Sequence, residues 1–176
     1  MIDPTIYENL KIILEGMVYD LDFDGRLKVT NRRDLVDLAS LSRKYNLEVF
    51  IKEKTGQGIK VKIELAAGLE DLADEIMERE TANTGCRFSV TYYLTVQDIE
   101  AECSELGETL RRIWKPYGEV SQRVSYIYGL PRGSYHNEIL INIDSKLHEE
   151  NSEQLEDYLE RMMASCKQIF HKGENK

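Results

Sequence analysis

The sequence lacks the hallmarks of a membrane or secreted protein. No apolar run approaches the roughly 20 residues that a membrane-spanning helix needs. The first residues, Met-Ile-Asp-Pro, do not form the basic-then-apolar region of a signal peptide. Cys86, Cys103 and Cys166 are odd in number and far apart, which indicates free thiols in a reducing compartment rather than a disulfide framework. We therefore expect a cytoplasmic protein without a membrane segment.

Metal-ligand spacing is also missing. The three histidines and three cysteines match no pattern such as CxxC or HExxH. Asp20, Asp22, Asp24 and Gly25 resemble the opening of a calcium loop, but the twelfth position of that loop, normally a glutamate, is Asn31. We therefore expect neither a bound metal nor a cofactor.

The composition is that of a folded domain. Of the 176 residues, 41% are hydrophobic and 31% are charged, which excludes collagen-like, low-complexity and largely disordered chains. A chain of this length buries about 70% of the surface that its unfolded form exposes, so it needs no metal or disulfide in order to fold. The length suits one domain or two small fused ones.

Residues 1–82 are predicted to form a first α+β unit. Its elements are, in order, an N-terminal helix at 4–15, a hairpin at 17–30, a helix at 31–45, a hairpin at 47–65 and a helix at 69–80. The helix at 31–45 rests on the helical spacing of Leu35, Leu38 and Leu41. In the second hairpin, a loop at 56–58 sets Lys52 opposite Lys62 on one face.

Residues 86–176 are predicted to form a second unit. Its elements are a strand at 87–95, a helix at 96–115, strands at 120–128 and 137–143, and a helix at 152–171. Both units then have the order strand, helix, strand, strand, helix. The sequence predicts an α+β fold of two tandem βαββα units, preceded by a helix and an extra strand. Its sheet is antiparallel or mixed, with helices on one face, and a single fused domain is the alternative.

Charge is unevenly distributed along the chain. The formal net charge is −9, yet residues 26–63 contain ten basic and four acidic residues. Most of the acidic residues lie in 64–80, 98–108 and 144–160. This pattern predicts a bipolar surface, with a basic first unit and acidic helices.

A bipolar surface without a catalytic motif favours a non-catalytic interaction protein that binds a charged protein partner. One form of this hypothesis is an acidic inhibitor that imitates nucleic acid. The partner-facing acidic residues are then predicted to be Glu70, Asp71, Asp74, Glu78, Glu153, Glu156, Asp157 and Glu160. Self-association through the strand edges is a further hypothesis.

Two other functions remain open on the sequence. The first is nucleic-acid or phospholigand binding through Lys52, Lys54, Lys60, Lys62, Arg32 and Arg33, although the net charge disfavours long duplexes. The second is a hydrolase-type enzyme that uses the loop at 129–138, where a nucleophile, a base and a cation come together. Arg132, Ser134, Tyr135 and His136 are the predicted contact residues of that loop.

Overall fold

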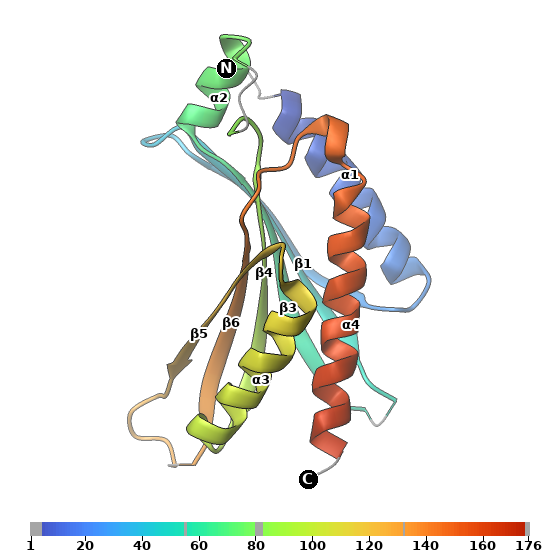
Figure 1. The fold of residues 1–176 in the computed structure, drawn as a ribbon, viewed down its shortest axis with the longest axis vertical. Helices are drawn as coiled ribbons and strands as arrows, with labels where there is room; N and C mark the ends of the chain where they lie inside the picture. The colour runs from blue at the N-terminus through green and yellow to red at the C-terminus, as the bar shows by residue number, and fades with distance from the viewer. Residues whose placement is uncertain (1–4, 55, 80–82, 132, 175–176) are drawn as a thin grey trace.

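The computed structural model describes residues 5–54, 56–79, 83–131 and 133–174, and they form an α+β fold (Figure 1). The elements are α1 (Thr5–Phe23), β1 (Lys28–Asp37), β2 (Ser42–Lys52), β3 (Gly58–Ala67), α2 (Leu69–Ile76), β4 (Arg87–Val96), α3 (Ile99–Trp114), β5 (Gly118–Ser125), β6 (Tyr135–Ile143), a 3₁₀ turn (Glu149–Asn151) and α4 (Gln154–Glu174).

The described strands form one antiparallel sheet in the order β1-β2-β3-β4-β6-β5. The pairing of β3 with β4 joins the parts of the chain that the sequence predicts as two units, so the hydrogen-bonded ladder continues from one into the other. The helices α1, α3 and α4 pack along one face of this sheet, as predicted (Figure 1).

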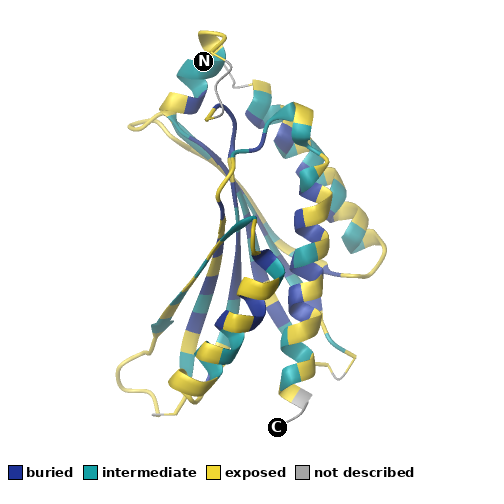
Figure 2. Cartoon of the chain, viewed as in Figure 1, coloured by how far each residue is buried: buried dark blue, intermediate teal, exposed yellow. Residues whose placement is uncertain are grey.

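The core lies between that face and the helices (Figure 2). Every second residue of β2 is buried: Tyr45, Leu47, Val49 and Ile51. In α1 the buried residues Leu10, Leu14 and Val18 follow helical spacing and meet this surface. An aromatic cluster fills the other half of the core, where the rings of Phe88 and Tyr158 stack at 5.4 Å. Trp114 donates its indole N–H to the hydroxyl of Ser165, at 3.1 Å.

The predicted elements of the second half are confirmed within a few residues. The observed β4, α3, β5, β6 and α4 have the predicted order strand, helix, strand, strand, helix. The apolar stripe of α4 brings Leu155, Leu159, Met162 and Cys166 into the core. Strand alternation and helical spacing were both strong signals here, because each element has one buried face.

The predicted hairpin at 17–30 is wrong, because α1 continues to Phe23. The segment predicted as an extra strand is therefore the end of α1. Gly25 has a φ of 72° and terminates the helix, with its N–H donating to the carbonyl of Asp22 and the N–H of Arg26 donating to that of Leu21. An Asp-Gly pair serves a helix C-terminus as well as a hairpin turn, and the buried Val18 keeps the helical spacing past Gly16.

The predicted helix at 31–45 is also wrong. This segment contains β1 and the start of β2, which pair as a long hairpin whose tip is residues 38–41. Tyr45 begins the alternating buried residues of β2, so its period is two rather than 3.6. Leu35, Leu38 and Leu41, which were predicted to form a buried stripe, are exposed. Residues 28–76 thus have the order βββα rather than βαββα.

The second predicted hairpin forms, but in a different register. Lys52 pairs with Gly58, and Lys62 pairs with Glu48 instead of with Lys52. The observed register places unlike charges opposite one another, which is more favourable than the predicted pairing of lysines. It differs from the prediction by an even number of residues, so Val49 and its apolar neighbours remain on the inner face.

Candidate functional site: the open face of the sheet

The second face of the sheet is largely polar, and we call it the open face. Successive side chains of a strand point to opposite faces, so the open face consists of the strand residues that alternate with the buried ones. Antiparallel sheets commonly leave one face in contact with water. Its charged residues are Lys28, Arg33, Asp37, Lys44, Glu48, Lys52, Lys60, Lys62, Glu64, Arg87, Glu119, Arg123 and Glu138.

One cross-strand row shows how these side chains interact. Its residues, from β1 to β5, are Lys28, Phe50, Lys60, Tyr93, Glu138 and Arg123. The ammonium of Lys60 lies 5.4 Å from the centre of the Tyr93 ring and 3.0 Å from the carboxylate of Glu48. At the other edge, Arg123 lies 3.7 Å from the carboxylate of Glu138. The row therefore alternates cations with rings and carboxylates.

These contacts change two pKa values. The hydrogen bond from Lys60 lowers the pKa of Glu48, against the opposing effect of partial burial. Burial raises the pKa of Tyr93, and the nearby charge of Glu138 adds to that effect. Glu48 therefore stays ionised and Tyr93 stays neutral around pH 7.

The centre of the open face is hollowed. A cavity of about 460 Å³, open to solvent, is lined by side chains of β3, β4, β5 and β6. They include Lys62, Thr91, Tyr93, Arg123 and Asn142. The lining also includes Glu64 and Glu138, so it offers hydrogen-bond donors and acceptors, two cations, two carboxylates and one aromatic ring, and it suits a polar ligand surface.

The described open face carries eight basic and five acidic residues. On the other side of the sheet, the packed helices α1, α3 and α4 together contain twelve acidic and six basic residues. The two sides of the sheet therefore differ in the sign of their excess charge.

The six predicted anion-binding residues do not all lie on the same face of the sheet. Lys60, Lys62 and Arg33 lie on the open face, Lys52 is exposed at the end of β2, and Lys54 lies in the loop that follows. Arg32 lies on the inner side instead, with its guanidinium 3.0 Å from the carboxylate of Glu15 and above the ring of Tyr45. Adjacent residues of a strand point to opposite faces, so Arg32 and Arg33 do not act together.

Of the four contact residues predicted for the loop at 129–138, His136 lies on the open face, as part of β6. His136 is exposed in the row of Thr95 and Ser125, while Tyr135 packs edge-on against Tyr126 at 6.3 Å. Ser134 is exposed, and Arg132 lies outside the described residues. Within the described part of the chain, no hydrogen bond joins Ser134, His136 and Glu138.

The predicted acidic residues also differ in their surroundings. Asp71 is buried, accepts a hydrogen bond from the N–H of Gly68 at 2.7 Å and pairs with Lys146. Glu160 lies 3.0 Å from Arg26, and Asp157 lies 3.0 Å from Arg161. Within the described residues, no ion pair involves the others, which are Glu70, Asp74, Glu78, Glu153 and Glu156.

Several open-face residues were missed by the sequence analysis. Lys44 falls in the segment that was predicted as a helix, so its place on a strand was hidden. Arg87, Arg123 and Tyr93 lie in correctly predicted strands, and strand alternation alone puts them on the face opposite the buried residues. What the sequence did not show is which strands are neighbours, because β4 pairs with both β3 and β6.

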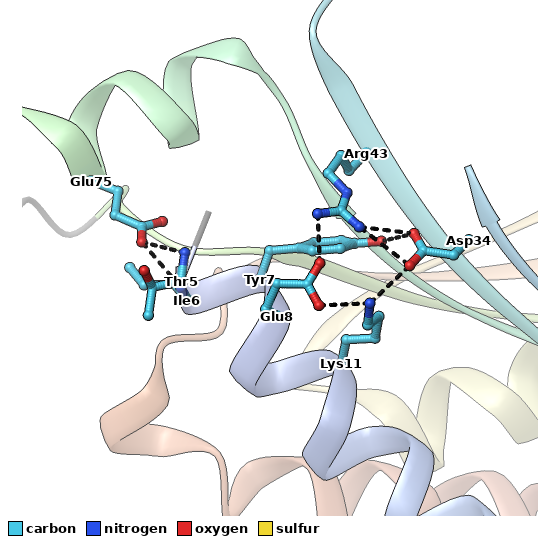
Figure 3. A network of polar contacts seen from close by, with 8 residues as sticks. All are labelled: Thr5, Ile6, Tyr7, Glu8, Lys11, Asp34, Arg43 and Glu75. Atoms are coloured by element: carbon cyan, nitrogen blue, oxygen red, sulfur yellow. Dashed lines mark hydrogen bonds and ion pairs between the residues drawn. The ribbon is translucent and has the colours of Figure 1, made fainter. Parts of the chain in front are cut away.

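A second polar cluster lies between α1 and the β1–β2 hairpin (Figure 3). Asp34 accepts hydrogen bonds from Tyr7 at 3.2 Å and Lys11 at 2.8 Å, and it pairs with Arg43 at 3.2 Å. Glu8 lies 2.6 Å from Lys11 and 2.5 Å from Arg43. The guanidinium of Arg43 also covers the Tyr7 ring, 4.6 Å from its centre. Each charge in the cluster has a partner, so the cluster holds α1 to the hairpin.

We expect Asp34→Asn to lower the free energy of unfolding by about 1–2 kcal/mol at neutral pH, because two cations and a phenol lose a charged acceptor. Although partial burial opposes it, the hydrogen bond from Lys11 and the nearby cations lower the pKa of Asp34. A lowered folded-state pKa stabilises the fold above the unfolded pKa of about 4, and this contribution is lost as the pH falls through the folded value.

Urea denaturation of wild type and Asp34→Asn at about pH 7 and about pH 3 measures this effect. The difference between the two proteins should shrink at the acidic pH. Asp20→Asn, an exposed aspartate of α1, is the control and should change little at either pH. An equal loss for Asp34→Asn at both pH values contradicts the assignment.

The chain resembles no known protein, and the part of it that the structure describes contains no metal cluster. None of the helices in the described residues is both long and apolar enough to cross a membrane. The same residues contain no group of three or more histidine, cysteine or acidic side chains placed to hold a metal ion. In comparisons with known proteins, no family model, no curated protein and no solved structure matches the chain.

Proposed function

We propose that the protein is a non-catalytic interaction protein whose open face binds an acidic surface of a protein partner. The supporting observation is the uncovered sheet face, which carries eight basic and five acidic residues and has a hollow of about 460 Å³ at its centre. The excess of positive charge on this face increases the rate of encounter with an acidic partner and orients that partner. The acidic helices on the other side add to that orientation, because they repel the same partner. The three free cysteines suit a cytoplasmic location.

Single-stranded nucleic acid is the second candidate ligand. Tyr93 and Phe50 lie on the open face beside Lys60, and aromatic rings next to cations are typical of surfaces on which bases stack. Glu48 lies in contact with Lys60 and Glu138 with Arg123, and both carboxylates would repel a phosphate backbone. This arrangement of carboxylates favours a protein ligand, whose own cations and amides are able to bind them.

Charge reversal on the open face tests the proposal. Labelled polyglutamate serves as the acidic polypeptide and labelled oligothymidylate as the nucleic acid, and fluorescence anisotropy measures their binding at low and high salt. We expect the wild type to bind polyglutamate more tightly than oligothymidylate, with affinity that falls as salt rises. The double variant Lys60→Glu/Lys62→Glu should bind polyglutamate about tenfold more weakly or worse.

The control variant is Lys167→Glu, which reverses an exposed lysine on α4, away from the sheet. It should leave binding close to that of the wild type. Equal losses in the control and the double variant, or no binding of polyglutamate by the wild type, contradict the proposal. Tighter binding of oligothymidylate, abolished by Tyr93→Ala, would instead support the second candidate.

A further inference from the structure

A group of apolar side chains is exposed at the tip of the β1–β2 hairpin. Leu35, Val36, Leu38 and Leu41 are between 44% and 72% exposed. Their sequence pattern resembles the buried stripe of a helix, yet in the hairpin they have nothing to pack against. Charged residues would be expected here, because exposed strand ends are normally protected by charge.

The helix α2 carries a second exposed apolar group at the same end of the molecule (Figure 1). Leu69 and Ile76 lie seven residues apart and so share one helix face, which Met77 extends, and all three are at least half exposed. The other side of α2 faces α1, where the carboxylate of Glu75 accepts hydrogen bonds from the backbone of Thr5 and Ile6.

The sheet register places the two groups next to each other. Ala67, the last residue of β3, pairs with Arg43 of β2. Leu41 lies two residues before Arg43 and Leu69 two residues after Ala67, so both come from the same end of neighbouring strands. We call the combined surface the end patch, and it consists of Leu35, Leu38, Leu41, Leu69, Ile76 and Met77, because Val36 points to the opposite face of β1 from Leu35.

The two halves of the end patch have flanking charges of opposite sign. Arg33 and Lys44 accompany the hairpin half, and Glu70 and Asp74 accompany the helix half. Within the described residues, no ion pair involves these four side chains. Asp37, at the base of the tip, adds one negative charge to the hairpin half, which still keeps an excess of positive charge, and its carboxylate accepts hydrogen bonds from the backbone N–H groups of Ala39 and Ser40.

We propose that the end patch is the interface of a homodimer, in which α2 of one copy packs on the hairpin of a second copy. A two-fold axis makes this contact twice, so each acidic helix half meets a basic hairpin half. Both halves of the patch are apolar and their flanking charges have opposite signs. The helix half of one copy is therefore complementary to the hairpin half of another. The inference goes beyond the proposed function: Arg33 and Lys44 belong to the open face, but Lys60 and Lys62, which test partner binding, lie outside the end patch.

Sedimentation velocity over a range of protein concentrations tests the dimer. We expect a monomer–dimer equilibrium in the wild type. Leu38→Asp on the hairpin and Ile76→Asp on α2 should each raise the dissociation constant about tenfold or more, because each buries a charge in the interface. Ile12→Asp is the matched control, since Ile12 is a similarly exposed isoleucine on another helix, and it should leave the dissociation constant unchanged.

Charge-reversed pairs test the two-fold arrangement itself. Arg33→Glu/Lys44→Glu makes both halves of the patch acidic, and Glu70→Lys/Asp74→Lys makes both halves basic. Each double variant should therefore be monomeric alone. When the two are mixed, every contact joins unlike charges again, so a heterodimer should form, and it should weaken as salt is added.

Three outcomes would overturn the inference. They are a wild type that stays monomeric at the highest concentration it tolerates, a wild-type dimer that Leu38→Asp and Ile76→Asp leave intact, and mixed double variants that do not associate. Circular dichroism of each variant shows that it is folded. A dimer lost equally in Ile12→Asp would place the interface elsewhere.

Discussion

Replacing Gly85 with alanine is expected to lower the free energy of unfolding by about 3–5 kcal/mol. Gly85 has a φ of +132°, a region that residues with a Cβ rarely adopt. A Cβ at this position would overlap the backbone carbonyl of Leu147. The next residue, Cys86, exchanges two backbone hydrogen bonds of 2.8 Å with Leu147, and these tie the start of β4 to the segment before α4. Alanine therefore strains the backbone and separates this bridge.

Chemical denaturation of Gly85→Ala beside Gly16→Ala measures this effect. Gly16 lies within α1, and no atom lies within 4 Å of a Cβ built there. Alanine at position 16 should therefore raise the free energy of unfolding by about 0.5–1 kcal/mol, because glycine is a poor helix former. If Gly85→Ala is as stable as the wild type, the close approach to Leu147 is not a feature of the folded protein.

Asp71→Ala is expected to cost about 2–4 kcal/mol, the second largest loss. Its carboxylate is buried, accepts the N–H of Gly68 at the start of α2 and pairs with Lys146. Removing it leaves a partly buried ammonium and a backbone N–H without their acceptor. Asp71→Asn keeps an oxygen for the N–H of Gly68, so it should lose less stability than alanine.

The control for Asp71 is Glu156→Ala, which removes an exposed acidic side chain of α4. It should change the free energy of unfolding by less than about 0.5 kcal/mol. The comparison also separates a buried acidic residue from an exposed one, a difference in burial that the sequence could not show. A loss in Glu156→Ala equal to that in Asp71→Ala would mean that burial of Asp71 does not matter.

The second half of the fold, from β4 to α4, could be predicted well from the sequence because the apolar pattern of each segment is compatible with only one type of element. In β4, alternate residues such as Phe88 and Val90 are buried, and in α4 every third or fourth residue is. Propensity, periodicity and capping agree there, so element type and order follow from the sequence. Boundaries still differ by a few residues, as in α3, which begins at Ile99 rather than 96.

In the first half, local signals were compatible with two structures. Asp24-Gly25 suits a hairpin turn and a helix end equally, and only the burial of Leu14 and Val18 against the sheet selects the helix. For residues 31–45, the spacing of Leu35, Leu38 and Leu41 indicated a helix, whereas tertiary pairing with β2 imposes a strand. Leu35 is exposed on β1, and Leu38 and Leu41 are exposed in the turn at the tip of the hairpin.

Local sequence patterns predict the candidate site only in part. The lysines at 60 and 62 could be assigned to one face from alternation alone, but Tyr93 and Arg123 join them only because β4 lies beside β3 and β6 beside β4. Strand order depends on long-range packing and is not written in any local pattern. Asp71 and Glu70 are neighbours in sequence, yet one is buried and the other exposed.

The strand order also has a consequence for the way in which the chain reaches its folded state. In the described sheet, four of the five pairings join strands that are consecutive along the chain, and only β4 with β6 does not. The meander from β1 to β4 is therefore able to form from local contacts during synthesis. The pairing of β4 with β6 closes the loop of residues 97–134, which carries a larger entropy cost. That closure is the expected slow step of folding, and α4 completes the core after it.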